Sequence, residues 1–227
     1  MSIATLPVAP SSAPYTVAFA DSATAAIAAL TESERREHDR LPHDARRRDW
    51  LAGRCAAKRA VAARCGAPLP LDCIQLEPRA GAAPLCMVRD DSQHWTPLPF
   101  SLSIAHRDGL AIAAAADSAT LVGVDIERVD EIVPEHYRYF LAQRERSSAA
   151  HIDATLVWVL KEAAWKALGL GAALPFTALQ LAFARDTGRL QGVWVESAWM
   201  AARAHVMRFS RPRHLLAAVV EIKRETQ

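Results

Sequence analysis

The sequence predicts an α+β protein, because helix and strand patterns alternate twice along its 227 residues. The first round contains two helix patterns followed by strands, and it ends near Thr120. The second round opens with a strand at Leu121 and continues with helices and further strands. Composition agrees with a globular chain that can bury a substantial core, since 51% of the residues are hydrophobic and 23% are charged.

The first half has two helix patterns, of which the second has a clear end. We expect one helix from about Ser22 to Asp39 and another from about Asp44 to Cys65, which Gly66 caps. A loop with two prolines is expected farther along the chain, at 90–99, and its Trp95 looks unusually exposed. The expected strands are centred on Ile74 and Leu85 and cover 100–104 and 109–116.

The second half continues with two helix patterns after the strand at Leu121. A short helix is expected near Pro134 to Gln143, and a longer one from about Ile152 to Leu168, which Gly169 and Gly171 stop. The remaining strands are expected at 179–183, 192–196, 204–209 and 215–222.

The chain divides on these patterns into a flexible amino-terminal segment, 1–14, and two halves, 15–120 and 121–227. The opening segment lacks the basic start of a signal peptide, and no apolar run reaches the roughly 18 to 20 residues that span a bilayer. The four cysteines have no C-x-x-C spacing, which indicates reduced thiols. We therefore expect a cytoplasmic monomer that does not bind a membrane.

Net charge gives no sign of a nucleic-acid partner. The formal charge is +2, and no basic patch is interleaved with stacking aromatic residues. Nucleic-acid binding is therefore not expected.

One buried strand pattern carries two acidic residues in Gly123-Val124-Asp125-Ile126-Glu127. Because side chains alternate across a strand, Asp125 and Glu127 share a face about 7 Å apart. Two neighbouring carboxylates repel each other and are costly to bury unless a cation lies between them. A Mg²⁺ site would resolve this conflict, and an edge strand with a solvated face is the alternative interpretation.

The last long helix pattern carries charged residues in apolar surroundings. The helix from about Ile152 to Leu168 is apolar nearly all round, yet Glu162 and Lys166 lie one turn apart on one flank. Ionised side chains in a buried helix need partners. A simple intrahelical salt bridge, worth only about 0.2–0.5 kcal/mol if exposed, is the alternative.

Together the two motifs resemble the signature of the Sfp-type 4′-phosphopantetheinyl transferases, G-[VI]-D-x-E followed by W-x-x-K-E-[AS]-x-x-K. The segment 101–109 is similar to the family's S/N-x-S-H-S segment, and 47–54 is similar to its R-x-x-x-L-x-G-R helix. The resemblance covers about Arg46 to Gly171. It implies a 4′-phosphopantetheinyl transferase-like fold of two similar α+β halves about a pseudo-twofold axis, with the active site in the cleft between them.

The resemblance also implies roles for the charged residues. Asp125, Glu127 and Glu162 would hold Mg²⁺ against the pyrophosphate of coenzyme A, and Glu162 would act as the general base, directly or through a metal-held water. Lys166 would neutralise phosphate charge or orient that base. Lys161 lies about 100° round the helix from Glu162, and it is expected to be either a solvated lysine or a substrate contact.

A group of cations in the first half suits the 3′-phosphate of coenzyme A. Arg47, Arg54 and Lys58 fall within about 40° of one another on the helix from Asp44 to Cys65. A solvated charged face explains the same spacing. His106 is expected to donate to the same phosphates, and a purely structural histidine is the alternative.

Two positions depart from the family pattern. Ala105 stands where the family commonly has a hydroxyl residue, and Ser103 or Arg107 are candidates to replace it. The G-K-P string of the family becomes Gly81-Ala82-Ala83-Pro84 without the lysine, for which Arg79 or Arg89 are candidate substitutes.

The resemblance implies a Mg²⁺-dependent holo-[carrier-protein] synthase. Such an enzyme transfers 4′-phosphopantetheine from coenzyme A to a serine of an apo acyl, peptidyl or polyketide carrier protein and releases 3′,5′-ADP. The W-x-x-K-E-A form resembles the subgroup associated with fatty-acid and polyketide carriers. Two alternatives remain open, namely a Mg²⁺-dependent phosphohydrolase of a nucleotide-type phosphate ester, and a non-catalytic module that binds carrier proteins or coenzyme A.

Overall fold

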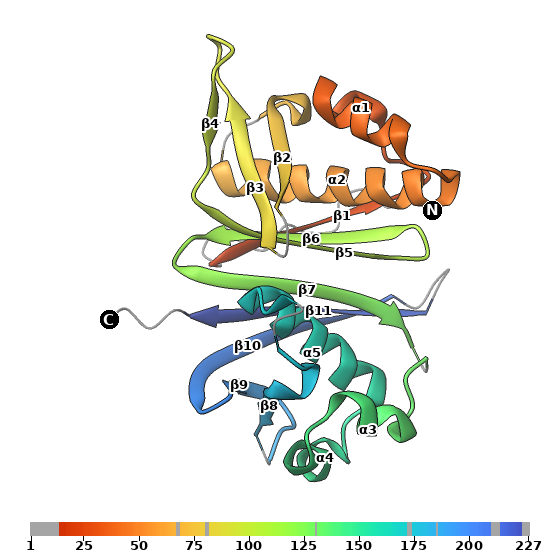
Figure 1. Cartoon of the computed structure of the whole chain (residues 1–227), viewed down its shortest axis with the longest axis vertical. Coiled ribbons are helices and arrows are strands. Elements are labelled where there is room, and N and C mark those ends of the chain that lie inside the picture. Colours follow the sequence, from red (N-terminus) through yellow and green to blue (C-terminus); the bar gives the residue numbers. More distant parts are fainter. Residues whose placement is uncertain are drawn as a thin grey trace. The chain divides into compact units, whose positions relative to one another are not determined.

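A computed structural model describes residues 14–66, 69–79, 82–129, 131–171, 174–184, 186–209 and 214–223. The chain forms two compact units, the first ending at Ser118 and the second beginning at Ala119. Each unit contains antiparallel strands and a long helix packed on them, so the α+β class is confirmed (Figure 1). Nearly all of the expected amino-terminal segment, 1–14, lies outside the described residues.

The first unit has two three-stranded sheets, in the orders β1-β6-β5 and β2-β3-β4. The long helix α2 packs on β6 and β1. The strands are β1 (Tyr15–Asp21), β2 (Ile74–Arg79), β3 (Ala82–Arg89), β4 (Trp95–Pro97), β5 (Phe100–Arg107) and β6 (Leu110–Asp117). The helices are α1 (Glu32–Arg40) and α2 (Asp44–Cys65), with 3-10 turns at Ile27–Ala29 and Leu71–Cys73.

The β5–β6 hairpin closes on two residues that favour left-handed backbone. Asp108 and Gly109 have φ of 51° and 75°, as the tight Asp-Gly hairpin turn requires. Arg107 therefore faces Leu110 directly in the ladder. This turn fixes where His106 lies, at the end of β5.

Two expectations for the first unit were wrong. The helix expected from Ser22 begins only at Glu32, because Thr31 and Glu34 form a capping box in which Glu34 accepts from the Thr31 N–H at 3.0 Å. Trp95 lies in strand β4 rather than in an open loop, and it is half-buried with the Arg89 guanidinium 5.6 Å from its ring centroid.

The second unit has one five-stranded sheet in the order β7-β11-β10-β9-β8. Its strands are β7 (Thr120–Arg128), β8 (Leu179–Phe183), β9 (Leu190–Val195), β10 (Ala198–Phe209) and β11 (Leu215–Lys223). Its helices are α3 (Tyr137–Phe140), α4 (Gln143–Ala149) and α5 (Ala154–Leu168), with 3-10 turns at Pro134–His136 and Phe176–Ala178. The long helix α5 packs on β7 and β11.

The helix expected near Pro134 to Gln143 is divided in the structure. The backbone is extended at Leu141 and Ala142, which separates α3 from α4. Glu145 stabilises the new start, since its carboxylate accepts from the Ala142 N–H at 2.8 Å.

The ends of α5 follow from local sequence. Asp153 accepts a hydrogen bond from the Leu156 N–H at 2.9 Å, so the helix begins after it rather than at Ile152. Gly169 ends the helix in the left-handed region with φ of 62°. Gly123 on β7 permits close packing, because a Cβ there would lie 1.8 Å from the Ala163 carbonyl oxygen.

No helix among the described residues is long and apolar enough to cross a membrane. The four cysteines are free thiols, as expected. Burial raises the pKa of Cys86 to about 12, so this thiol is a poor nucleophile.

Candidate active site

The strand β7 and the helix α5 bring three of the expected site residues together. Lys166 on α5 donates to the Oδ1 atom of Asp125 on β7 at 2.6 Å. The Asp125 side chain is 9% exposed and that of Lys166 is 33% exposed. The Oδ2 atom of Asp125 is buried and has no hydrogen-bond partner among the described residues. A buried carboxylate oxygen in this state is costly unless a ligand or ion completes it.

Glu162 joins this pair from the preceding turn of α5. Burial raises the pKa of Glu162, and the Asp125 carboxylate raises it further, while Lys166 opposes both effects. A raised pKa makes the ionised carboxylate a better proton acceptor near neutral pH. Glu127 lies two residues after Asp125 on β7 and is half-buried.

The residues suit Mg²⁺ without forming a complete metal cage. The described parts of the chain contain no group of three His, Cys, Asp or Glu residues arranged to hold a metal ion. Mg²⁺ commonly takes only one or two carboxylates and fills its other positions with phosphate oxygens and water. The buried Oδ2 atom of Asp125 is the observation that fits such an ion.

Lys161 is neither solvated nor available to a substrate, so both expectations for it were wrong. Its side chain is 0% exposed, and its Nζ donates to both carboxylate oxygens of Glu145 at 2.9 and 2.7 Å. It also donates to the Leu179 carbonyl. The sequence indicated that a lysine in an apolar helix needs an acidic partner. It did not indicate which acidic residue that partner is.

The cationic stripe expected on α2 is not assembled. Lys58 is 0% exposed, forms a buried ion pair with Glu34, and donates to the Ala29 carbonyl at 2.7 Å. Arg47 donates to the Leu41 carbonyl at 2.9 Å and to Asp44 at 3.2 Å. Both cations therefore bind partners within the first unit. Neither lines the pocket described next.

A pocket of about 650 Å³ in the first unit does contain two of the expected residues, Arg54 and His106. Arg54 is 7% exposed, lies 4.6 Å from the Trp50 ring centroid, and donates to the Leu76 carbonyl at 2.9 Å. His106 is more open, with its Nδ1 atom 4.0 Å from Asp49. Its imidazole is half exposed and therefore accessible to a ligand.

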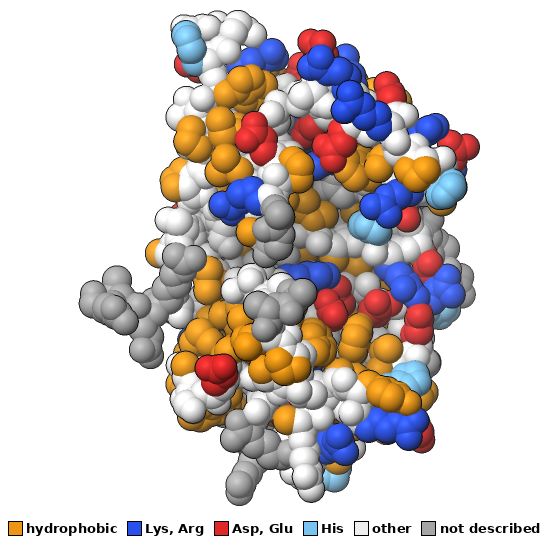
Figure 2. All heavy atoms as spheres, viewed as in Figure 1, with side chains coloured by type: hydrophobic (Ala, Val, Ile, Leu, Met, Phe, Trp, Pro, Cys, Tyr) orange, Lys and Arg blue, Asp and Glu red, His pale blue; other side chains and the backbone are white. Residues whose placement is uncertain are grey.

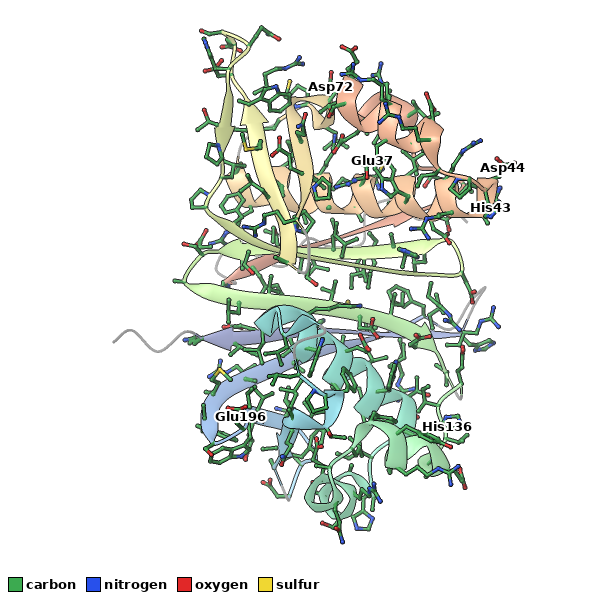
Figure 3. The ribbon with its side chains drawn as sticks, in the orientation of Figure 1. Glu37, His43, Asp44, Asp72, His136 and Glu196 are labelled. Carbon is green, nitrogen blue, oxygen red and sulfur yellow. The ribbon has the colours of Figure 1, made fainter. Side chains whose placement is uncertain are left out.

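The pocket also contains basic residues that the sequence patterns did not single out. They are His43, the N-cap residue of α2, and the exposed Arg46 in the first turn of that helix. Figure 3 labels His43 at this end of α2, together with Glu37 on α1, whose carboxylate lies 3.6 Å from Arg54. Figure 2 shows that Lys and Arg side chains, interleaved with Asp and Glu, cover the part of the unit that carries α1 and α2. The sequence offered no signal that distinguishes Arg46 from its neighbours in the run of three arginines at 46–48.

Neither candidate substitute for the missing G-K-P lysine lines this pocket. Arg79 donates to the Ala83 carbonyl at 2.8 Å. Arg89 lines a different pocket, beside Trp95. Pro84 of the same string does line the pocket, while Gly81 lies outside the described residues.

Comparison with known proteins gives a match for the second unit. Residues 121–214 match the family model of the 4′-phosphopantetheinyl transferase superfamily. The matched segment begins in β7, ends just before β11, and contains Asp125, Glu162 and Lys166. The similarity to this superfamily therefore coincides with the candidate active site.

Solved structures are also similar to the chain. Among them is the crystal structure of Thermotoga maritima holo-[acyl-carrier-protein] synthase, at 20% identity and a TM-score of 0.36. The match covers 46% of this chain and 63% of that chain. No curated protein matches the sequence.

Proposed function

We propose that this protein is a Mg²⁺-dependent 4′-phosphopantetheinyl transferase of the Sfp type, with an apo carrier protein and coenzyme A as its substrates. The observation that carries the proposal is the convergence of Asp125, Glu162 and Lys166 within the segment that matches the superfamily. A simple salt bridge within α5 does not account for this arrangement, because Lys166 is bound to Asp125 on a different element.

The proposed reaction breaks the phosphoanhydride bond of coenzyme A and forms a phosphoester bond to the carrier serine. The serine Oγ of the carrier forms a bond to the phosphorus that bears the pantetheine arm, while the pyrophosphate bond to that phosphorus breaks and 3′,5′-ADP leaves. Asp125, Glu127 and Glu162 would hold Mg²⁺, which supplies charge stabilisation to the pyrophosphate. Glu162 would accept the serine proton, and its raised pKa suits that role.

Lys166 has two roles in this proposal. It neutralises Oδ1 of Asp125, which leaves Oδ2 as the oxygen for the metal. Its partly exposed ammonium can also meet a phosphate oxygen, since it carries three donors.

The pocket of the first unit is proposed to take the 3′-phosphate end of coenzyme A. Arg46 and His106 are its exposed hydrogen-bond donors, and Arg54 is a buried cation that also lines it. Lys58 and Arg47 are not retained in this role, because neither lines this pocket and Lys58 is buried in an ion pair with Glu34.

Intact-mass analysis of an apo carrier protein, incubated with coenzyme A, Mg²⁺ and this protein, tests the proposal. A gain of one phosphopantetheine group, dependent on all components, is the expected result. Release of phosphopantetheine or phosphate without carrier modification would instead establish a phosphohydrolase. Binding of the carrier or coenzyme A with no chemical change would establish a binding module.

The same reaction, run with different carrier proteins, tests which class of carrier is the preferred substrate. The W-x-x-K-E-A form of 158–163 favours acyl and polyketide carriers over peptidyl carriers. We expect the kcat/KM with an acyl or polyketide carrier to exceed that with a peptidyl carrier.

A further inference from the structure

The buried Glu145 is a hub that joins three elements of the second unit. Its Oε2 atom accepts from the Ala142 N–H at the start of α4 at 2.8 Å. Its Oε1 atom accepts from the Leu181 N–H of β8 at 2.8 Å. Lys161 of α5 binds both of these oxygens and the Leu179 carbonyl. We call Glu145, Lys161 and these backbone partners the second hub.

The first unit contains the same arrangement. Glu34 accepts from the Thr31 N–H at the start of α1 at 3.0 Å through Oε2, and from the Leu76 N–H of β2 at 3.1 Å through Oε1. Lys58 of α2 pairs with Oε2 of Glu34 and donates to the Ala29 carbonyl. We call this group the first hub. In both hubs a glutamate in the first turn of a short helix binds a strand amide and a lysine of the long helix.

What differs is the residue next to each lysine. Lys161 is followed directly by Glu162, and Lys166 lies five residues later. The corresponding residues after Lys58 are Arg59 and Ala63, neither of which can act as a carboxylate base. Only the second hub is therefore attached to the helix turn that faces Asp125.

We propose that Lys161 is a positioning residue: the second hub fixes α5 so that Glu162 and Lys166 are held against Asp125. Two contacts restrain this turn of α5. Lys161 ties one side of it to α4 and β8, and on another side Ala163 lies against Gly123 with no room for a Cβ. A helix held in two directions keeps the orientation of its side chains, and such preorganisation is what catalysis requires.

The lysine content of the chain allows a direct structural test. Its only lysines are Lys58, Lys161, Lys166 and Lys223. Lys58 and Lys161 are fully buried, so reductive ¹³C-methylation of the native protein labels Lys166, Lys223 and the amino terminus. Methylation retains the positive charge, and Lys166→Arg assigns the Lys166 signal. Because Lys166 is paired with Asp125 and Lys223 is exposed, we expect their NMR signals to differ in the wild type.

In Lys161→Met we expect the Lys166 methyl signal to move towards that of Lys223. The matched control is Lys58→Met, which removes the same charge from the first hub and leaves the Lys166 signal in place. If Lys161→Met fails to fold, the double variant Lys161→Met/Glu145→Gln takes its place, because it leaves no unpaired buried charge. An unchanged Lys166 signal in the folded variant, or an equal movement in Lys58→Met, would overturn the proposal.

Kinetics give a second readout, which rests on the proposed function. At a temperature where every variant is folded, Lys161→Met should lower kcat by about 10- to 100-fold, the penalty typical of a misplacement of about 1 Å. Its KM for coenzyme A should stay within about threefold, because its proposed effect is on the reacting groups. Loss confined to KM would contradict positioning. A wild type without transferase activity would refute the proposed function, while the Lys166 signal would still decide the positioning role.

Discussion

The two units share a buried glutamate–lysine hub, yet among the described residues it is the hub of the second unit that lies beside the candidate active site. Lys58 and Lys161 are both fully buried, and each donates to a glutamate and to a backbone carbonyl. Beside Lys161 lies Glu162, whereas Arg59 beside Lys58 donates to the Phe19 carbonyl at 2.9 Å. The comparison teaches that the hub is a structural device common to both units, and that in the second unit it lies next to the residues of the candidate active site.

The comparison also explains why charge alone was a poor guide to the site. Burial lowers the pKa of both Lys58 and Lys161, and their glutamate partners oppose this effect. Both lysines belong to the helices in which we sought phosphate ligands, but neither reaches solvent. Lys166 is the partly exposed lysine of α5, and it is the one that lies at the candidate active site.

The largest expected effect comes from removing the Asp125 carboxylate. Asp125→Asn keeps the volume and an acceptor for Lys166 but weakens metal binding, so kcat should fall by about 10²–10⁴-fold at a fixed Mg²⁺ concentration. Steady-state kinetics with an apo carrier protein measure this loss. The control is Asp117→Asn on β6, which removes a carboxylate paired with Arg64 and should change kcat by less than about twofold. Similar kcat values for the two variants would remove Asp125 from the site.

The hubs should matter equally for stability. Glu34→Gln and Glu145→Gln each leave a buried lysine without its counter-charge, so each should lower the free energy of unfolding by about 3–5 kcal/mol. Adding Lys58→Met or Lys161→Met to the matching variant should recover most of that loss. Urea unfolding measures these values. A cost below about 1 kcal/mol for either single variant would show that its hub is not a strong structural element.

Alanine substitutions at two glycines compare a steric clash with a gain in helix propensity. Gly123→Ala places a Cβ 1.8 Å from the backbone oxygen of Ala163, and it should destabilise the protein by about 1–3 kcal/mol as α5 is displaced. Gly53→Ala on α2 meets only the Ile104 side chain at 3.3 Å. Because alanine favours a helix by about 1 kcal/mol over glycine, this variant should be neutral or more stable. Equal destabilisation by both substitutions, measured by thermal unfolding, would show that the close approach of α5 is unimportant.

The smallest expected effect concerns the pocket of the first unit. Arg46→Ala/His106→Ala should weaken coenzyme A by on the order of tenfold, about 1.4 kcal/mol, and barely change the affinity for 3′-dephospho-coenzyme A. Titration calorimetry with both ligands measures this difference. Arg48→Ala, an exposed arginine that does not line the pocket, is the control. Equal weakening of both ligands would remove the 3′-phosphate from this pocket.

Local sequence was a good guide to the elements that position the site. The acidic strand and the long helix were predicted because apolar periodicity and the terminal Gly169 are local signals. The start of α1 was missed, because the alanines of 23–29 look helical while the capping box at Thr31 decides the start. The approach of Asp125 to Lys166 joins residues 41 positions apart, so it was suggested by the family motifs and not by periodicity.

Ion-pair partners were the main feature that the sequence did not disclose. A buried lysine requires an acid, but Glu145 lies on a separate helix and is identifiable only after α4 and α5 are placed. The same holds for Glu34 and Lys58. Of the expected stripe, Arg54 lines the pocket of the first unit, whereas Lys58 is buried against Glu34. Helical geometry gives the direction of a side chain but not whether another element already covers it.

Glu162→Gln gives the most direct test of the claim that the second unit carries the chemistry. It retains volume and hydrogen-bonding capacity and removes only the charge, so loss of a general base should lower kcat by about 10²–10⁴-fold while KM for coenzyme A stays within about threefold. The fold should survive. Burial raises the pKa of Glu162. Ionising this carboxyl therefore lowers the free energy of unfolding as pH rises through the folded-state pKa. The metal-free Glu162→Gln variant should accordingly be no less stable at neutral pH than the metal-free wild type. Wild-type kcat, or a loss confined to KM, would contradict the assignment of Glu162 as the base.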